Sequence, residues 1–257
     1  MKKITFFLFG VFLLVNIISC QKDSSKPSDL SLTVSQDRVI GHLGDTLPIS
    51  IIASTSTDKI TSITMTKTGG KTVSIPLVSN PSSYSQGISY IVSDSVGTLV
   101  FTITAKGENL VDPIIKKLTF TIVKDVEITM GASASSLPSF INGNTLLTYN
   151  ATEAAANQSL VDLVYKYSAT DGAIVGAPND TIFPLPSWTI KNATKIGKIM
   201  DESPDAVSMV TGSSVKNLAV GDMLGYITIN GVKGIIEVMD IKTGTSGSAT
   251  LTFMVIK

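Results

Sequence analysis

The stretch Leu99-Val100-Phe101-Thr102-Ile103-Thr104 decides the fold of the first half of the chain. Its apolar and polar side chains alternate with a period of two, which is typical of a strand with one face against a core. We therefore expect Leu99, Phe101 and Ile103 to face inward. Other short segments rich in Ser, Thr, Val and Ile surround this one, and Gly, Pro, Asn and Asp separate them. They span residues 31–34, 47–52, 60–65, 72–78, 89–92 and 117–123.

Seven short strands within about 95 residues predict an antiparallel β-sandwich over residues 29–124, because no stretch of this region has the pattern of a long amphipathic helix. Two segments also resemble bacterial immunoglobulin-like domains. The resemblance implies an immunoglobulin-like sandwich, with another antiparallel sandwich as the alternative. The segment similar to the second strand of such domains is Gly44-Asp45-Thr46-Leu47-Pro48-Ile49-Ser50-Ile51, and the segment similar to their late strand pair is Asp94-x-x-Gly97-x-Leu99-x-Phe101-x-Ile103-x-Ala105.

The second half, residues 125–257, is predicted to be a β-rich domain with one or two short helices, so the whole chain is expected to be mostly β. Its end is the clearest part, because three segments joined by turn residues predict an antiparallel meander. A short helix is predicted over residues 151–158, with Asn150 or Thr152 as its N-cap. The remaining expectations are strands at 126–130, 160–167, 223–229, 234–241 and 249–256, a loop at 174–186 and a second short helix at 194–200.

The first twenty residues have the pattern of a targeting segment. Lys2 and Lys3 precede a mainly apolar stretch over residues 4–18, which is too short for a membrane span and fits the apolar region of a signal peptide. The stretch ends in Ile17-Ile18-Ser19-Cys20, which resembles the lipobox of bacterial lipoproteins. That resemblance implies a signal peptide over residues 1–19, a lipidated Cys20 and a flexible tether over residues 20–28, so that the membrane is a partner through an N-terminal lipid anchor.

Two further resemblances concern location. Gln21-Lys22-Asp23 is similar to the surface-export signal of Bacteroidetes lipoproteins, which implies an outer-membrane lipoprotein exposed on the cell surface, with a periplasm-facing protein as the alternative. The second half also resembles the C-terminal domains of such lipoproteins, which implies location and architecture but no activity. The residues that carry this second resemblance are Val161-Asp162-Leu163-Val164-Tyr165, Ala177-Pro178-Asn179-Asp180, Trp188 with Asn192-x-Thr194-Lys195, and Val220-Gly221-Asp222.

Composition excludes several classes of function. The 20 Lys and Arg residues balance the 20 Asp and Glu residues, and without a basic cluster this argues against nucleic acid as a partner. One Cys and one His exclude zinc fingers, Cys/His proteases and His-rich metal sites. We therefore expect no metal, no cofactor and no catalytic residue. His42 is expected to be an exposed loop residue, and the carboxylates Asp201, Glu202 and Asp205 are expected to form a polar loop rather than a glycosidase pair.

The candidate ligand-binding residues lie in the second half. Trp188, Tyr165, Tyr167 and Phe183 could form a platform on which sugar rings stack. The alternative, which a sole Trp close to Pro184 and Pro186 favours, is that Trp188 fills a core. Asp162 lies within an apolar strand, where a carboxylate must be hydrogen-bonded or change its pKa. Either a structural partner, such as a backbone turn or Lys195, or a binding role would account for it.

These observations predict a non-catalytic, lipid-anchored protein of the outer membrane or cell surface that binds a glycan or a protein partner through its C-terminal domain. The first domain would act as a spacer. A structural or assembly subunit of an outer-membrane complex is the alternative, and a glycan-acting hydrolase ranks last.

Overall fold

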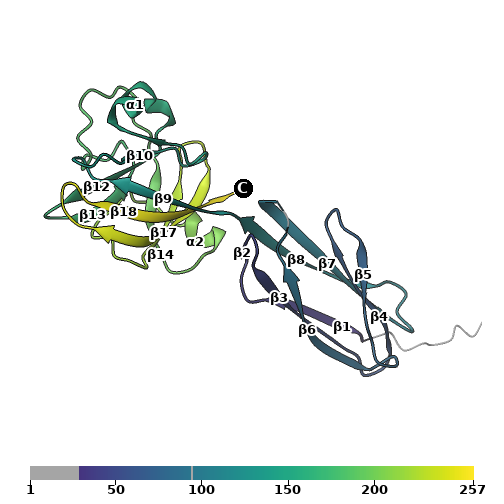
Figure 1. Cartoon of the computed structure of the whole chain (residues 1–257). Helices are drawn as coiled ribbons and strands as arrows, with labels where there is room; N and C mark the ends of the chain where they lie inside the picture. Colours follow the sequence, from purple (N-terminus) through teal and green to yellow (C-terminus); the bar gives the residue numbers. More distant parts are fainter. Residues whose placement is uncertain (1–28, 94) are drawn as a thin grey trace, which may run out of the picture.

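The computed structural model of the chain describes residues 29–93 and 95–257. Two β-rich domains lie end to end (Figure 1). The prediction of a mostly β chain with one or two short helices is confirmed. The predicted signal peptide, the lipidated Cys20 and the tether fall outside the described residues.

The first domain is a sandwich of two β-sheets. One sheet has the strand order β1-β3-β6 and the other has the order β2-β8-β7-β4-β5. Neighbouring strands are antiparallel, except that β2 runs parallel to β8. The strands are β1 (Ser31–Gln36), β2 (Ile40–His42), β3 (Thr46–Ser54), β4 (Ile60–Lys67), β5 (Thr72–Ile75), β6 (Ser83–Ile91), β7 (Gly97–Gly107) and β8 (Ile114–Val123).

The core of the sandwich forms from the alternating positions that the sequence indicated. Leu99, Phe101 and Ile103 are buried in one apolar cluster. The ring of Phe101 meets the rings of Tyr90 and Phe120 edge to face, with centroids 4.9 and 5.9 Å apart. Edge-to-face pairs stabilise a core beyond the area that they bury. Strand β2 was not predicted, because its three residues are too few to show a period.

Strand β5 pairs with β4 and not with β6. In a seven-stranded immunoglobulin domain, the strand that corresponds to β5 is the fourth. It pairs with the fifth strand, in the sheet that also contains the first two strands. Here it has joined the opposite sheet. As a result β6 is the last strand of its sheet, with one edge open.

The second domain also contains two sheets around a core. The orders are β11-β10-β12-β13-β15 and β14-β16-β17-β18-β9, and β16, β17 and β18 form the predicted antiparallel meander. The elements are β9 (Asp125–Gly131), β10 (Phe140–Ile141), β11 (Thr148–Tyr149), α1 (Ala151–Ala156), a 3-10 turn (Gln158–Leu160), β12 (Leu163–Ser168), β13 (Gly172–Gly176), β14 (Lys195–Ile199), α2 (Pro204–Ser208), β15 (Ser214–Val215), β16 (Met223–Ile227), β17 (Lys233–Lys242) and β18 (Ser248–Ile256).

Three local expectations were wrong in this domain. The segment 194–200 forms strand β14 instead of a helix, because it pairs along its whole length with β16. Part of the expected loop at 174–186 belongs to strand β13, which pairs with β12. The expected polar loop around Pro204 contains helix α2, which Ser203 caps and in which Pro204 occupies the first turn. Helix α1 forms as predicted, and Asn150 caps it in a capping box.

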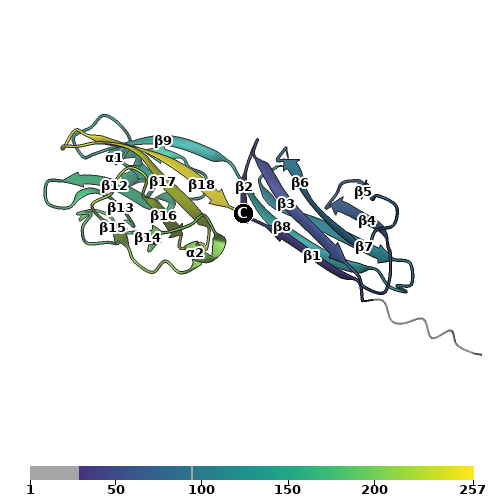
Figure 2. The ribbon, with the colours of Figure 1, turned by 90° about the horizontal axis from the view of Figure 1, so that it is seen from below.

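The two domains meet at a joint that both of them build. Only Lys124 separates β8 from β9, so the chain passes from one domain to the other almost without a break (Figure 2). Ile40 and Val123 of the first domain pack in one apolar cluster with side chains of the second. We call this cluster the domain joint, and its buried members from the second domain are Ile199, Ala206, Val207, Val210, Ile235 and Met254.

Candidate functional site

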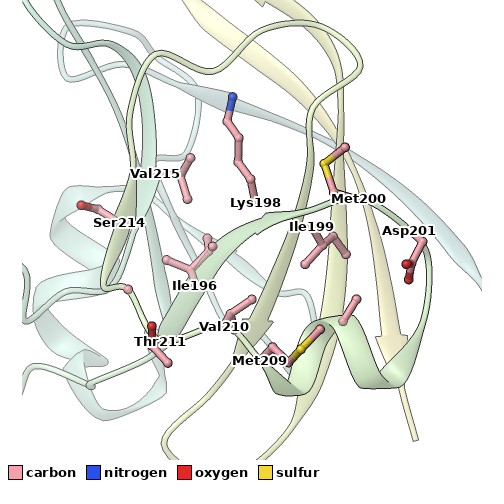
Figure 3. Close-up of a pocket in the computed structure, with 13 residues that line it drawn as sticks. Ile196, Lys198, Ile199, Met200, Asp201, Met209, Val210, Thr211, Ser214 and Val215 are labelled. Carbon is pink, nitrogen blue, oxygen red and sulfur yellow. The ribbon is translucent and has the colours of Figure 1, made fainter.

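A groove of about 500 Å³ opens beside β14, the last strand of its sheet (Figure 3). We call it the edge groove. Strand β14 forms one wall, and helix α2 with the segment that leads to β15 forms the other. Its lining residues are Ile196, Gly197, Lys198, Ile199, Met200, Asp201, Ala206, Met209, Val210, Thr211, Gly212, Ser214 and Val215.

Main-chain geometry leaves part of β14 open toward this groove. The N–H of Ile196 points away from β16 and donates to the carbonyl of Gly212, 2.7 Å away. Residues two apart on a strand direct their main-chain groups to the same side, so the N–H of Lys198 also points outward. Among the described residues it has no main-chain partner. The groove therefore offers a strand edge as well as side chains.

The side chains of the edge groove are apolar at its base and flexible at its rim. Ile199 and Val210 are buried at the base, where they also belong to the domain joint. Met200 and Met209 stand at the rim with 93% and 74% of their surface exposed. The Lys198 ammonium is held by Asp222 at 2.6 Å. Methionine is unbranched and polarizable, and it is over-used at surfaces that adapt to a partner.

The predicted aromatic platform is not exposed. Trp188 is 8% exposed and stacks on Phe140, with ring centroids 5.4 Å apart. Phe183 lies in the same buried cluster, whereas Tyr165 is buried on the opposite face of β12 and the partly buried Tyr167 packs there too. The side chains of Tyr165 and Tyr167 share a face because alternate residues of a strand do. The loop that carries Trp188 covers the other face, so the four rings are divided between two cores.

A smaller hollow of about 260 Å³ lies over part of the Trp188 cluster. Phe140, Val164 and Phe183 line it, and Lys166 reaches from it to donate to the carbonyl of Ile182 at 3.0 Å. Although Tyr165 also contributes to the lining, its side chain packs in the core between the two sheets. The aromatic residues Phe140 and Phe183 that line this hollow are buried, and its lysine is already hydrogen-bonded.

Asp162 has structural partners. Its carboxylate, in a residue that is 4% exposed, accepts hydrogen bonds from the N–H of Gly143 at 2.9 Å and from the amide of Asn192 at 3.3 Å. The hydroxyl of Tyr226 donates to the carbonyl of Gly143 at 2.6 Å, which fixes the same turn. Burial raises the pKa of Asp162, while the two hydrogen bonds oppose that change. The turn at Gly143 is the backbone partner that the sequence suggested, and Lys195 takes no part.

His42 was expected to be exposed in a loop, and this was wrong. It ends β2 at the domain joint, where its side chain is 16% exposed. Its Nδ1 lies 2.7 Å from Asp125 and its Nε2 lies 3.0 Å from Glu202, so one ring connects the two domains. The hydrogen bond with Glu202 raises the pKa of His42 to about 9, with Asp125 adding to the effect and burial opposing it. No local pattern could have shown this, because Glu202 lies 160 residues away.

These contacts engage His42 and Glu202, the side chains that an acid-base role at the domain joint would need. Both ring nitrogens of His42 bond to carboxylates, so neither is available to activate a nucleophilic hydroxyl. The hydrogen bond from His42 lowers the pKa of Glu202, whereas a glycosidase acid needs a raised one. Asp205 lies in the first turn of α2.

The described part of the chain brings no three metal-binding side chains together. None of its helices has the length and the apolar run that a bilayer crossing would need. Comparison with protein-family models, with curated proteins and with solved structures finds no match to this chain.

Proposed function

We propose that this protein is a non-catalytic, lipid-anchored protein of the cell surface that binds a protein partner through the edge groove of its second domain. The observation that carries the proposal is the combination of a buried apolar base with two exposed methionines, Met200 and Met209. Apolar surface gathered in one place is typical of contact sites for other macromolecules. The lipid anchor rests on the lipobox at Cys20.

A protein fits the groove better than a glycan. Sugars are held by exposed aromatic faces, and the rings of Trp188, Phe183 and Tyr165 are buried. An extended peptide could instead pair with the open N–H of Lys198 and place apolar side chains between Met200 and Met209. A glycan remains the alternative occupant.

The first domain has the role of a spacer in this proposal. Its strands β4 and β5 lie at the end of the molecule away from the second domain (Figure 1). The domain joint and His42 hold the two domains in one arrangement, so the groove is carried at a set distance from the anchor end. This supports display of the groove away from a membrane.

The test is site-specific photo-crosslinking on intact cells. A photoreactive amino acid replaces Met209 in the full chain, and the same amino acid at Val111 is the control, because Val111 is 95% exposed but lies in the first domain. We expect a discrete protein adduct from position 209 and none from position 111, and we expect Met200→Glu to abolish it. The groove proposal fails if both positions give the same adducts. Adduct formation that Met200→Glu leaves unchanged also contradicts it.

Two further measurements separate the remaining alternatives. Metabolic labelling with a fatty-acid analogue should mark the wild-type chain and not Cys20→Ala, and an unlabelled wild type would remove the anchor from the proposal. A glycan array with residues 21–257 should show no binding. Glycan binding that Met200→Glu abolishes would replace the protein partner with a carbohydrate.

A further inference from the structure

Strand β6 presents a long open edge at one side of the first domain. It pairs with β3 on one side only, because β5 has joined the other sheet. The other outer strand of the same sheet, β1, lies beside β8 of the second sheet, and the side chain of Gln36 donates to the carbonyl of Thr119 on β8 at 3.2 Å. We consider the open edge of β6, the nine-residue strand Ser83–Ile91.

The register with β3 shows which groups of β6 are open. The N–H of Val92 donates to Asp45, and the carbonyl of Ser82 accepts from Thr55, so even-numbered residues point toward β3. The pairing has no register shift between these two points. Odd-numbered residues therefore point to the free edge. They are Ser83, Ser85, Gly87, Ser89 and Ile91, and no partner for their main-chain groups is present among the described residues.

This edge lacks the usual protection against pairing. Natural edge strands carry lysine, proline or a bulge that prevents another strand from adding to them. The sequence of β6 is Ser-Tyr-Ser-Gln-Gly-Ile-Ser-Tyr-Ile, without a charge, a proline or a bulge.

Gly87, at the centre of β6, is not required by the fold of a single chain. A Cβ at this position would meet nothing within 4 Å, and its backbone does not have the positive φ that favours glycine. Glycine within a strand costs stability, and it often marks a place where another backbone approaches. The glycine is therefore a second sign that something lies against this edge.

We propose that β6 pairs antiparallel with β6 of a second copy of this chain, about a two-fold axis that passes beside Gly87. In this register Gly87 faces Gly87 of the second copy, Ser85 faces its Ser89, and Ser83 faces its Ile91. Every outward N–H then meets an outward carbonyl. The arrangement joins two three-stranded sheets into one continuous sheet.

The side chains agree with this register. Tyr84 comes opposite Tyr90 of the second copy on the core side of the sheet, and aromatic cross-strand pairs stabilise antiparallel strands. The small side chains of Ser85 and Ser89 face each other on the outer side. Because no side chain of β6 is charged, two copies of the strand meet without like-charge repulsion. In the main chain, each N–H group of one copy faces a carbonyl group of the other. Such a self-complementary patch is what a two-fold interface requires.

The contact is narrow, so the dimer is expected to be weak. A strand of nine residues is roughly 30 Å long, and pairing along one edge buries less than the interface of a stable complex. The dimer should accordingly form at high local concentration. It involves neither the edge groove nor the domain joint, so it stands apart from the proposed function.

Sedimentation velocity of residues 21–257, which include both domains, tests the pairing with two matched double variants. Ser85→Lys with Ser89→Lys places like charges opposite each other across the axis. Ser85→Glu with Ser89→Lys at the same positions places opposite charges there. Both serines are exposed, so neither variant disturbs the core of a single chain.

Over a range of about 1 to about 300 µM, we expect wild type to pass from monomer to dimer. The Lys/Lys variant should raise the dissociation constant at least about tenfold, and the Glu/Lys variant should keep or lower it. The proposal is overturned if wild type stays monomeric at the highest concentration. It is also overturned if the two variants dimerise equally, since the contact would then lie elsewhere.

Discussion

The sharpest prediction concerns the proton on His42. Its pKa of about 9 lies above the ordinary 6.5, because Glu202 and Asp125 favour the charged ring. Replacing Glu202, whose hydrogen bond is the largest cause, should let the pKa of His42 fall toward 6.5. Two other charged groups lie close to His42. The backbone N–H of His42 donates to the carboxylate of Asp45 at 3.1 Å, and Arg38 forms an ion pair with Asp45 at 2.9 Å.

The magnitude follows from linkage between protonation and folding. A rise from 6.5 to about 9 would correspond to ~3 kcal/mol at 1.36 kcal/mol per pKa unit. Because the Asp125 side chain is 51% exposed, solvent screens part of its interaction with His42. We therefore expect the protonated ring to add ~1–2 kcal/mol to the free energy of unfolding. The folded pKa is the higher one, so this stabilisation is complete below pH 6.5 and is lost as the pH rises through 9.

The assay is direct because His42 is the only histidine in the chain. An NMR titration of the tag-free protein follows a single imidazole. The wild-type protein should give a pKa near 9 for His42, and Glu202→Gln should lower that pKa by more than one unit. Asp201→Asn is the control. It removes a neighbouring carboxylate that does not contact the ring, so the pKa of His42 should stay unchanged. Urea unfolding of wild type against His42→Gln should show a difference that shrinks between pH 6.5 and 9. A wild-type pKa below about 7 would refute the reasoning.

Three further substitutions test the second domain. Trp188→Ala should lower the free energy of unfolding by ~3–5 kcal/mol through loss of core packing, measured by urea denaturation followed by circular dichroism. Tyr226→Phe should cost ~1–2 kcal/mol in the same assay, since the carbonyl of Gly143 loses its buried hydrogen bond. Gly234→Ala should cost ~1–3 kcal/mol or prevent folding, because the added Cβ would lie 2.3 Å from the buried ring of Tyr226. Equal stability of any variant and wild type would contradict the corresponding contact.

The sequence allowed the strands to be predicted where their pattern is local. The alternation at Leu99–Ile103 marks β7 directly, and turn residues separate the strands of the terminal meander. Strand β14 could not be predicted in this way. Its isoleucines at 196 and 199 have helical spacing, and only the pairing with β16, where Gly197 lies opposite Gly225, makes it a strand.

The candidate site depended on contacts between distant segments. The edge groove exists because β14, α2 and the segment before β15 come together. Strand β14 was predicted to be a helix, α2 was predicted to be a loop, and the segment before β15 was not predicted. The sequence left two alternatives for Trp188, and only packing against Phe140 decides between them. The same holds for His42, whose two carboxylate partners come from the other domain.

The place of β18 in its sheet governs the order in which the chain can fold. This strand lies between β17 and β9, so the last and first strands of the second domain are neighbours. Phe253 and Leu251 of β18 are central to the core, which cannot close before residues 248–256 are present. The first domain needs only residues 31–123. During synthesis the first domain can therefore fold while the core of the second domain stays open until β18 has been made.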